Sequence, residues 1–161
     1  MNQNKVFVCA DTHFNHEKIN EYGLRPFNTT HEMNETLIAN WNKTVGKEDT
    51  VYFLGDLCFE TKDKKKEYWL NRLNGHIIWV KGNHDHFKGL IDTIYFENMF
   101  MIHDPWGTGV GYRICIHGHQ HNKGKLIDKR HKRICVSMEL INYTPIELKV
   151  ILKRYYDEKA N

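Results

Sequence analysis

Short apolar runs of strand length recur along the chain, separated by polar stretches. They are rich in β-branched and aromatic residues and lack polar alternation, which is typical of strands in sheets that are covered on both faces. Six such runs predict buried strands: residues 6–9, 51–54, 77–80, 100–102, 114–116 and 134–136. Strands of this kind, interrupted by helical segments, indicate an α/β fold.

Three segments carry helical signals. In the first, Thr29 precedes Glu32 at capping-box spacing. The apolar stripe that follows it consists of Met33, Leu37, Ile38, Trp41 and Val45. A second helix is expected over residues 62–73. The sequence Thr144-Pro145-Ile146-Glu147 predicts the start of a third helix, with Thr as cap and Pro in the first turn, running to about Tyr156.

Length and composition set the class of protein. The 161 residues, 40% hydrophobic and 27% charged, are expected to form one domain spanning residues 1–161. Lys and Arg exceed Asp and Glu by only 23 − 20 = 3, so charge alone indicates neither nucleic-acid nor membrane binding. The locally basic segments 62–66 and 129–133 are interpreted as solvated surface. No apolar stretch approaches the roughly 20 residues of a membrane helix.

The four cysteines, Cys9, Cys58, Cys115 and Cys135, are far apart and form no Cys-x-x-Cys pair. We expect buried free thiols, which fit a reducing cytoplasmic compartment. The first residues lead straight into a short apolar run and lack the features of a signal peptide.

Polar clusters follow five of the six predicted strands. They are Asp11-Thr12-His13, Gly55-Asp56, Gly82-Asn83-His84-Asp85, His103 and His117-Gly118-His119-Gln120-His121. Each alone has an ordinary interpretation, such as turn chemistry for Gly-Asp or a partly buried histidine for His103. Because ligands bind outside the carboxyl ends of strands in α/β sheets, we expect the clusters to converge on one site.

Carboxylate, imidazole and amide side chains suit divalent ions such as Mn, Fe, Ni or Zn, and the clusters contain no Cys for a structural thiolate zinc site. The expected ligands are too many for one tetrahedral ion but suit two ions that share a bridging carboxylate. They are Asp11, His13, Asp56, Asn83, His103, His119 and His121. Two metal ions, with Mn as the leading choice, are therefore the expected cofactors.

In the order and spacing of these blocks the sequence resembles the calcineurin-like metallophosphoesterases. The segment from Asp11 to His16, together with Arg25-Pro26-Phe27 and Trp41-Asn42, resembles the small phage and bacterial branch of that family. The resemblance implies a four-layered α/β/β/α sandwich with the metals at one end of the sheets.

The resemblance also implies roles. Asp11, His13 and His121 would hold the first metal and Asn83, His103 and His119 the second, with Asp56 bridging. A hydroxide activated by the two metals would attack phosphorus in line. His84 would act as general acid toward the leaving group, and Asp85 would orient its ring. The implied activity is that of a phosphodiesterase or phosphatase acting on a small or flexible phosphate ester.

Departures from the family pattern narrow this expectation. After Gly55-Asp56 the chain reads Leu57-Cys58-Phe59-Glu60, without the Asp-Arg-Gly continuation of protein Ser/Thr phosphatases, and Asp85 stands where they have Glu, so protein dephosphorylation is not expected. The pattern assigns no role to His16, Asp104 or His117. Two alternatives remain: a nuclease, and a non-catalytic metal-binding scaffold with the same fold.

Overall fold

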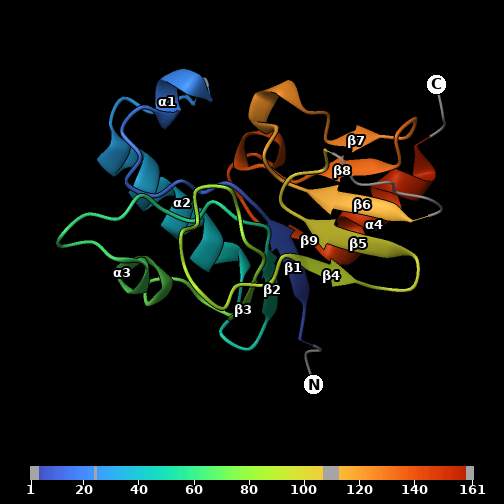
Figure 1. The fold of residues 1–161 in the computed structure, drawn as a ribbon, viewed down its shortest axis with the longest axis horizontal. Coiled ribbons are helices and arrows are strands. Elements are labelled where there is room, and N and C mark those ends of the chain that lie inside the picture. Colours follow the sequence, from blue (N-terminus) through green and yellow to red (C-terminus); the bar gives the residue numbers. More distant parts are fainter. Residues whose placement is uncertain (1–3, 24, 107–112, 159–161) are drawn as a thin grey trace.

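The computed structural model describes residues 4–23, 25–106 and 113–158. Its two sheets are drawn in Figure 1. The first has the order β3 (His76–Trp79), β2 (Thr50–Phe53), β1 (Val6–Cys9) and β9 (Ile146–Glu147). The second has the order β4 (Thr93–Tyr95), β5 (Met99–Ile102), β6 (Ile114–His117), β8 (Arg133–Cys135) and β7 (Ile127–Asp128). The predicted α/β architecture is therefore confirmed as one domain with two sheets.

The strands that matter for the site are parallel. In the first sheet β1 pairs in parallel with β2, and β2 with β3. In the second, β6 pairs in parallel with both β5 and β8. A bridge between Ala10 and Ser137, just beyond β1 and β8, joins the two sheets at the carboxyl ends of these strands. That end is the place where α/β sheets present ligand-binding loops.

The helices pack around the sheets. α1 (Ile19–Tyr22), α2 (Thr30–Thr44) and α3 (Lys66–Leu70) lie on the left in Figure 1, on the side of the first sheet. α4 (Leu148–Asp157) contacts β1 and β9. Two 3₁₀ turns complete the fold, η1 (His121–Lys123) and η2 (Met138–Ile141). The four-layered stacking that the resemblance implies is a finer detail and stays a prediction.

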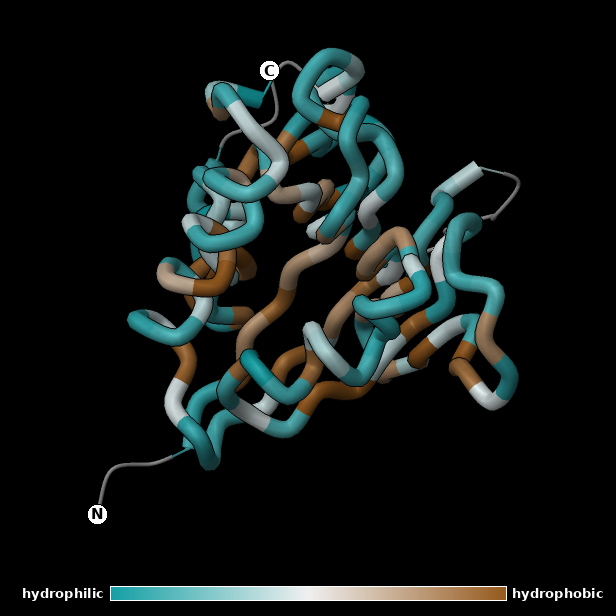
Figure 2. The backbone as a smooth tube through the Cα atoms, turned by 90° about the vertical axis from the view of Figure 1, so that its left-hand side faces the viewer, coloured by the Kyte–Doolittle hydropathy of each residue, from teal (hydrophilic) through white to brown (hydrophobic). Residues whose placement is uncertain are grey.

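One hydrophobic core connects these elements. Trp41 of α2 is fully buried beside Phe53 of β2, and Trp69 of α3 stacks on Phe14 with ring centroids 4.8 Å apart. Figure 2 shows brown segments running through the inside of the molecule and teal segments mostly around its outside, as the alternation of apolar runs and polar stretches predicts. All four cysteines are free and buried, as expected.

Seven predicted elements need little change: α2 and the strands β1, β2, β3, β5, β6 and β8 all lie where the apolar runs placed them. The helix predicted over residues 62–73 is shorter, because only α3 is α-helical. The Thr61 hydroxyl accepts a hydrogen bond from the Lys64 amide and forms a turn where the predicted helix would begin.

The predicted start of the third helix is wrong. Ile146 and Glu147 pair with β1 as the antiparallel strand β9, so α4 begins only at Leu148. The Thr144 hydroxyl donates to the Asn142 carbonyl instead of capping a helix. Among the described residues, none of the helices is long and apolar enough to cross a membrane.

Candidate metal centre

The five polar clusters converge at the carboxyl ends of the parallel strands, as expected. Asp11 and His13 follow β1, Asp56 follows β2, and Asn83 follows β3. His103 follows β5, and His119 and His121 follow β6. The structure thus brings all seven expected donors together at one end of the two sheets.

The first donor set consists of Asp11, His13 and His121. Each offers one ligand atom, and these atoms all lie within 4.8 Å of one another. The rings of His13 and His121 stack with centroids 5.1 Å apart. Asp11 and His13 are buried and His121 is half-buried, so this donor set is the more buried part of the site.

The second donor set consists of Asn83, His103 and His119. The Asn83 Oδ1 atom lies 2.9 Å from His103 Nε2 and 3.0 Å from His119 Nδ1. An amide oxygen between two imidazole nitrogens is a donor arrangement that a borderline divalent ion accepts.

Asp56 lies between the two sets. Its Oδ2 atom is 3.5 Å from His13 Nε2 and 3.4 Å from His103 Nε2. Its Oδ1 atom accepts a hydrogen bond from the His84 amide, which fixes the carboxylate. The Asp56 carboxylate is therefore placed to serve both donor sets at once.

Left-handed backbone marks this site. Asp11, His13, Asp56, His119 and His121 all have positive φ, between 48° and 69°. Such a conformation is uncommon for residues other than Gly and costs of order 1–3 kcal/mol each. Strain of this kind concentrates where a function requires it, and here it falls on five of the seven donors.

Two glycines of the motifs are required by close packing around Asp56. A Cβ atom on Gly82 would lie 2.1 Å from Asp56 Oδ1. Gly55 has φ +92°, and its Cβ would lie 2.6 Å from His103 Nδ1. The glycines before Asp56 and Asn83 thus allow the loops after β2 and β3 to touch.

Buried charges in the centre stabilise one another. Burial opposes the ionised form of Asp56, but the hydrogen bond and charge of His103 hold the pKa of this carboxyl well below its usual range. Burial likewise opposes the charged form of His103, yet Asp56 and Asp11 raise its pKa to about 9. At His13 burial dominates and lowers the pKa well below its usual range, so its ring is neutral at pH 7 and can donate a lone pair.

The buried polar atoms fit a bound cation. Asp11 Oδ1 and both ring nitrogens of His13 have no hydrogen-bond partner among the described residues. Buried polar groups are nearly always satisfied, so orphans gathered in one place call for a partner. A divalent cation at the Asp11, His13 and His121 set would supply it.

Outer partners hold the remaining histidines. His103 Nδ1 lies 2.7 Å from the Leu54 carbonyl, and His121 Nδ1 lies 3.0 Å from Glu139 Oε1. His119 Nε2 lies 3.9 Å from Asp104 Oδ2. Hydrogen-bonded partners such as the Leu54 carbonyl and Glu139 fix the tautomer and orientation of metal-binding imidazoles, whereas Asp104 lies only at ion-pair distance from His119.

Three residues near the donors were not marked as site residues by sequence reasoning. Ser137 donates to Asp11 Oδ2 at 2.6 Å. The buried Arg25 donates to the carbonyls of Asp11 and Thr12 and forms an ion pair with Glu139 at 2.8 Å. Ser137 and Glu139 follow β8, so the sixth predicted strand also leads to the site, a signal that its position offered.

His84 lies at the exposed edge of the centre. Its ring is 5.6 Å from the ring of His13, in an edge-on arrangement, and 5.4 Å from Phe59. The predicted role of Asp85 needs revision, because its buried carboxylate accepts hydrogen bonds from the amides of Asp56, Leu57 and Gly82 and from Trp79 Nε1. Asp85 holds the loop around Asp56 and not the ring of His84.

A cleft of about 660 Å³ opens beside the donors. His13, His84, His119 and His121 line it, together with His16, whose ring stacks on Phe59 at 3.9 Å. His117 is buried in β6, where its Nδ1 atom lies 2.7 Å from the Gly118 carbonyl, and it does not line the cleft.

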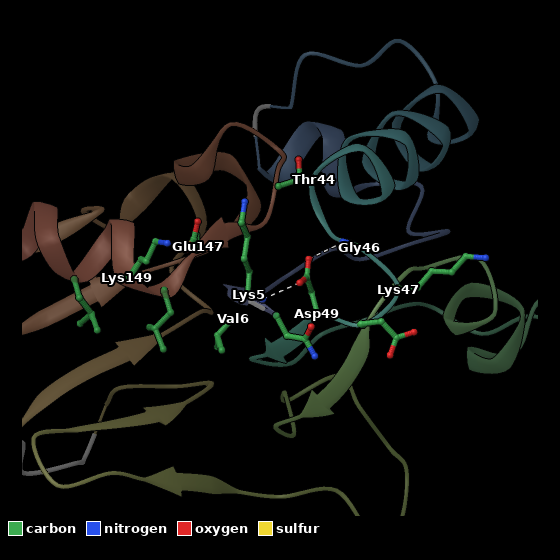
Figure 3. A pocket seen from close by; sticks show the side chains of 12 residues that line it. Lys5, Val6, Thr44, Gly46, Lys47, Asp49, Glu147 and Lys149 are labelled. Carbon is green, nitrogen blue, oxygen red and sulfur yellow. Dashed lines mark hydrogen bonds and ion pairs between the residues drawn. The ribbon is translucent and has the colours of Figure 1, made fainter. Parts of the chain in front are cut away.

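Another cavity, of about 980 Å³, lies near the opposite ends of β1 and β2 (Figure 3). Its charges are internally balanced: Lys149 pairs with Glu147 at 2.7 Å, and Asp49 accepts from the amides of Lys5 and Gly46. No cluster of metal-binding groups is found there among the described residues. The cleft beside the seven donors is therefore the candidate site.

Comparisons with known proteins identify the family and the fold of the chain. A family model described as calcineurin-like phosphoesterase matches residues 4–134. An uncharacterized protein of Methanocaldococcus jannaschii is 41% identical over 165 residues, covering 95% of this chain and 92% of that protein. The crystal structure of a protein of unknown function from Aquifex aeolicus shares the fold, with a TM-score of 0.68 at 24% identity over 94% of this chain and 100% of that one. With the family model matching most of its length, this chain belongs to the calcineurin-like phosphoesterases.

Proposed function

We propose that this protein hydrolyses phosphate esters at a centre of two divalent metal ions, with Mn as the leading choice and Fe, Ni or Zn as alternatives. The observation that carries the proposal is the position of Asp56, whose Oδ2 atom lies within 3.5 Å of a histidine nitrogen from each donor set. One carboxylate shared by two donor sets is the arrangement that a dinuclear centre needs.

The seven donor residues form the ligand sets of the two proposed metal ions. Asp11, His13 and His121 would hold one ion, and Asn83, His103 and His119 the other, with Asp56 between them. When bound, two such cations lower the pKa of a water molecule that attacks phosphorus and neutralise charge that develops on the phosphoryl oxygens.

His84 supplies the proton for the leaving group. Its ring lines the cleft beside His13, so it can face an ester oxygen while a phosphate lies at the donors. A positioned general acid contributes typically 10²–10⁴-fold in rate. Asp85 contributes indirectly, because it fixes the backbone from which both Asp56 and His84 project.

The experiment is hydrolysis of bis-p-nitrophenyl phosphate and of the monoester p-nitrophenyl phosphate by metal-stripped protein titrated with Mn²⁺. Saturable, metal-dependent turnover is expected, and the ratio of kcat/KM for the two esters ranks diester against monoester. Absence of turnover with Mn, Fe(II), Ni and Zn, despite bound ions, would favour the non-catalytic scaffold over the enzyme.

A further inference from the structure

The cleft beside the donors has an aromatic part that the proposed chemistry does not use. In addition to the imidazoles, the residues that line it include Ile19, Tyr22, Phe59 and Trp106. The rings form a chain of contacts: His84 lies 5.4 Å from Phe59, Phe59 3.9 Å from His16, and His16 6.3 Å from Tyr22. Aromatic surface therefore extends from the proposed general acid to the rim at Tyr22.

Two of these rings are exposed to solvent. Tyr22 and Trp106 are each 63% exposed. A single exposed aromatic side chain needs no explanation, but two that line the same cleft beside polar catalytic groups mark a binding site. Their rings offer flat faces for a ligand to stack on.

Trp106 is held in place. Its amide donates to Asp104 Oδ1 at 2.9 Å, and the Arg133 guanidinium lies 5.0 Å from the centre of its ring. Arg133 also donates to the Pro105 carbonyl at 3.2 Å. A ring fixed in this way loses little conformational freedom when a ligand stacks on it.

The charge of the cleft suits an anion. No Asp or Glu is among the described residues that line it, whereas Lys123 is. A volume of about 660 Å³ exceeds the needs of a phosphate group and falls within the range of pockets for small organic ligands. The occupant should therefore combine a phosphate with a flat organic group.

We propose that the cleft binds a nucleotide, with its phosphate at the metal donors and its base stacked against Tyr22 and Trp106. The position of the phosphate rests on the proposed function, whereas the stacking of the base can be tested without turnover. The inference names the substrate class as phosphate esters of nucleosides. Base stacking on aromatic side chains is largely indifferent to the identity of the base, so no base preference is assigned.

The test is calorimetric binding to the Mn²⁺-loaded protein of two non-hydrolysable phosphonates that differ in the base, the methylenephosphonate analogues of thymidine 5′-monophosphate and of 2-deoxyribose 5-phosphate. The nucleotide analogue should bind at least about tenfold more tightly. Tyr22→Ala and Trp106→Ala should each weaken its binding roughly 5- to 100-fold and leave binding of the sugar phosphonate unchanged. Tyr22→Phe and Trp106→Phe keep a ring and should retain most of the affinity.

Tyr95→Ala is the matched control, because Tyr95 is 67% exposed on β4 and does not line the cleft. Equal affinity for the two phosphonates, binding of neither, or alanine variants with unchanged affinity for the nucleotide analogue would overturn the inference. Turnover is measured separately, with the p-nitrophenyl ester of thymidine 5′-monophosphate and methyl p-nitrophenyl phosphate. Base-dependent binding without turnover would contradict the proposed function alone, and turnover without base dependence would contradict this inference alone.

Discussion

Two histidines of the centre, His121 and His103, each have one ring nitrogen held by an acceptor outside the donor set. For His121 the acceptor is Glu139, which Arg25 also binds. For His103 it is the Leu54 carbonyl, whereas His119 Nε2 lies 3.9 Å from Asp104 Oδ2 without a hydrogen bond. The other nitrogen of the His121 and His103 rings can then bind a metal ion. The affinity for metal should therefore depend on these partners as well as on the metal ligands themselves.

Glu139→Gln tests this dependence. The variant keeps an acceptor oxygen for His121 Nδ1 but removes the charge that stabilises the imidazole and pairs with Arg25. We expect affinity for Mn²⁺ to fall about 10- to 100-fold, measured by calorimetric titration. Glu35→Gln is the control, since Glu35 pairs with Arg72 away from the donors. The same affinity in both variants would contradict the role assigned to Glu139.

His84→Ala tests the general acid. Because His84 is not in either donor set, the variant should keep its bound metal ions while kcat falls about 10²–10⁴-fold. The loss should shrink for esters with a good leaving group, which needs no proton. His86→Ala is the control, as His86 is an exposed histidine two residues further along. Full activity of His84→Ala on an alkyl phosphate ester would rule out the assignment.

Sequence reasoning placed the donors but not their partners. Asp11, His13, Asp56 and Asn83 follow apolar runs and could be located from that position alone. Arg25 lies away from these runs, and Ser137 and Glu139 follow the sixth predicted strand, but only the folded structure shows their contacts with Asp11 and His121. The interpretation of Asp85 failed for a related reason, since three of its four hydrogen-bond donors are backbone amides, which no residue type reveals.

At the scale of elements, capping signals in the sequence predict the start of α2 correctly but the start of α4 wrongly. The Thr29 hydroxyl accepts a hydrogen bond from the Glu32 amide, and Glu32 accepts one from Asn28. At Thr144 the local signal is overridden, because Ile146 and Glu147 use their backbone to pair with β1. Local capping chemistry predicts a helix only where no neighbouring strand competes for the same backbone groups.

This contrast can be measured. Thr29→Ala should lower the free energy of unfolding by about 1 kcal/mol, because the variant leaves an amide at the start of α2 without its acceptor. Thr144→Ala removes a hydroxyl that caps no helix and should have a smaller effect. Urea unfolding followed by circular dichroism gives both values. If Thr144→Ala lowered the free energy of unfolding as much as Thr29→Ala or more, the contribution assigned to the cap of α2 would be contradicted.

Apolar runs proved a sound guide to the four-residue strands, among them β6, which is buried along its whole length, and β1, which is buried at three of its four residues. The strands that escaped prediction are β4, β7 and β9, which have two or three residues each. Segments this short have no periodicity of their own, so their pairing is decided by the neighbouring strand. The shortened α3 reflects the same limit, since a turn at Thr61 replaces the start of the predicted helix.

At the scale of the whole molecule, two mixed sheets joined through Ala10 and Ser137 place the ends of six parallel strands on one side. Five of these ends carry donors, and the sixth carries Ser137 and Glu139. The fold concentrates left-handed backbone, buried carboxylates and unsatisfied polar atoms there. These features together are the reason to expect metal ions at this centre and not at the cavity of Figure 3.

The most direct test of the dinuclear centre is the number of Mn²⁺ ions that bind to metal-stripped protein, counted by native mass spectrometry and calorimetric titration. The account predicts two ions per chain. It also predicts that Asp56→Asn weakens both binding events together, because its carboxylate lies between the two donor sets. A single ion bound to the wild-type chain, or an Asp56→Asn variant that binds both ions with unchanged affinity, would contradict it.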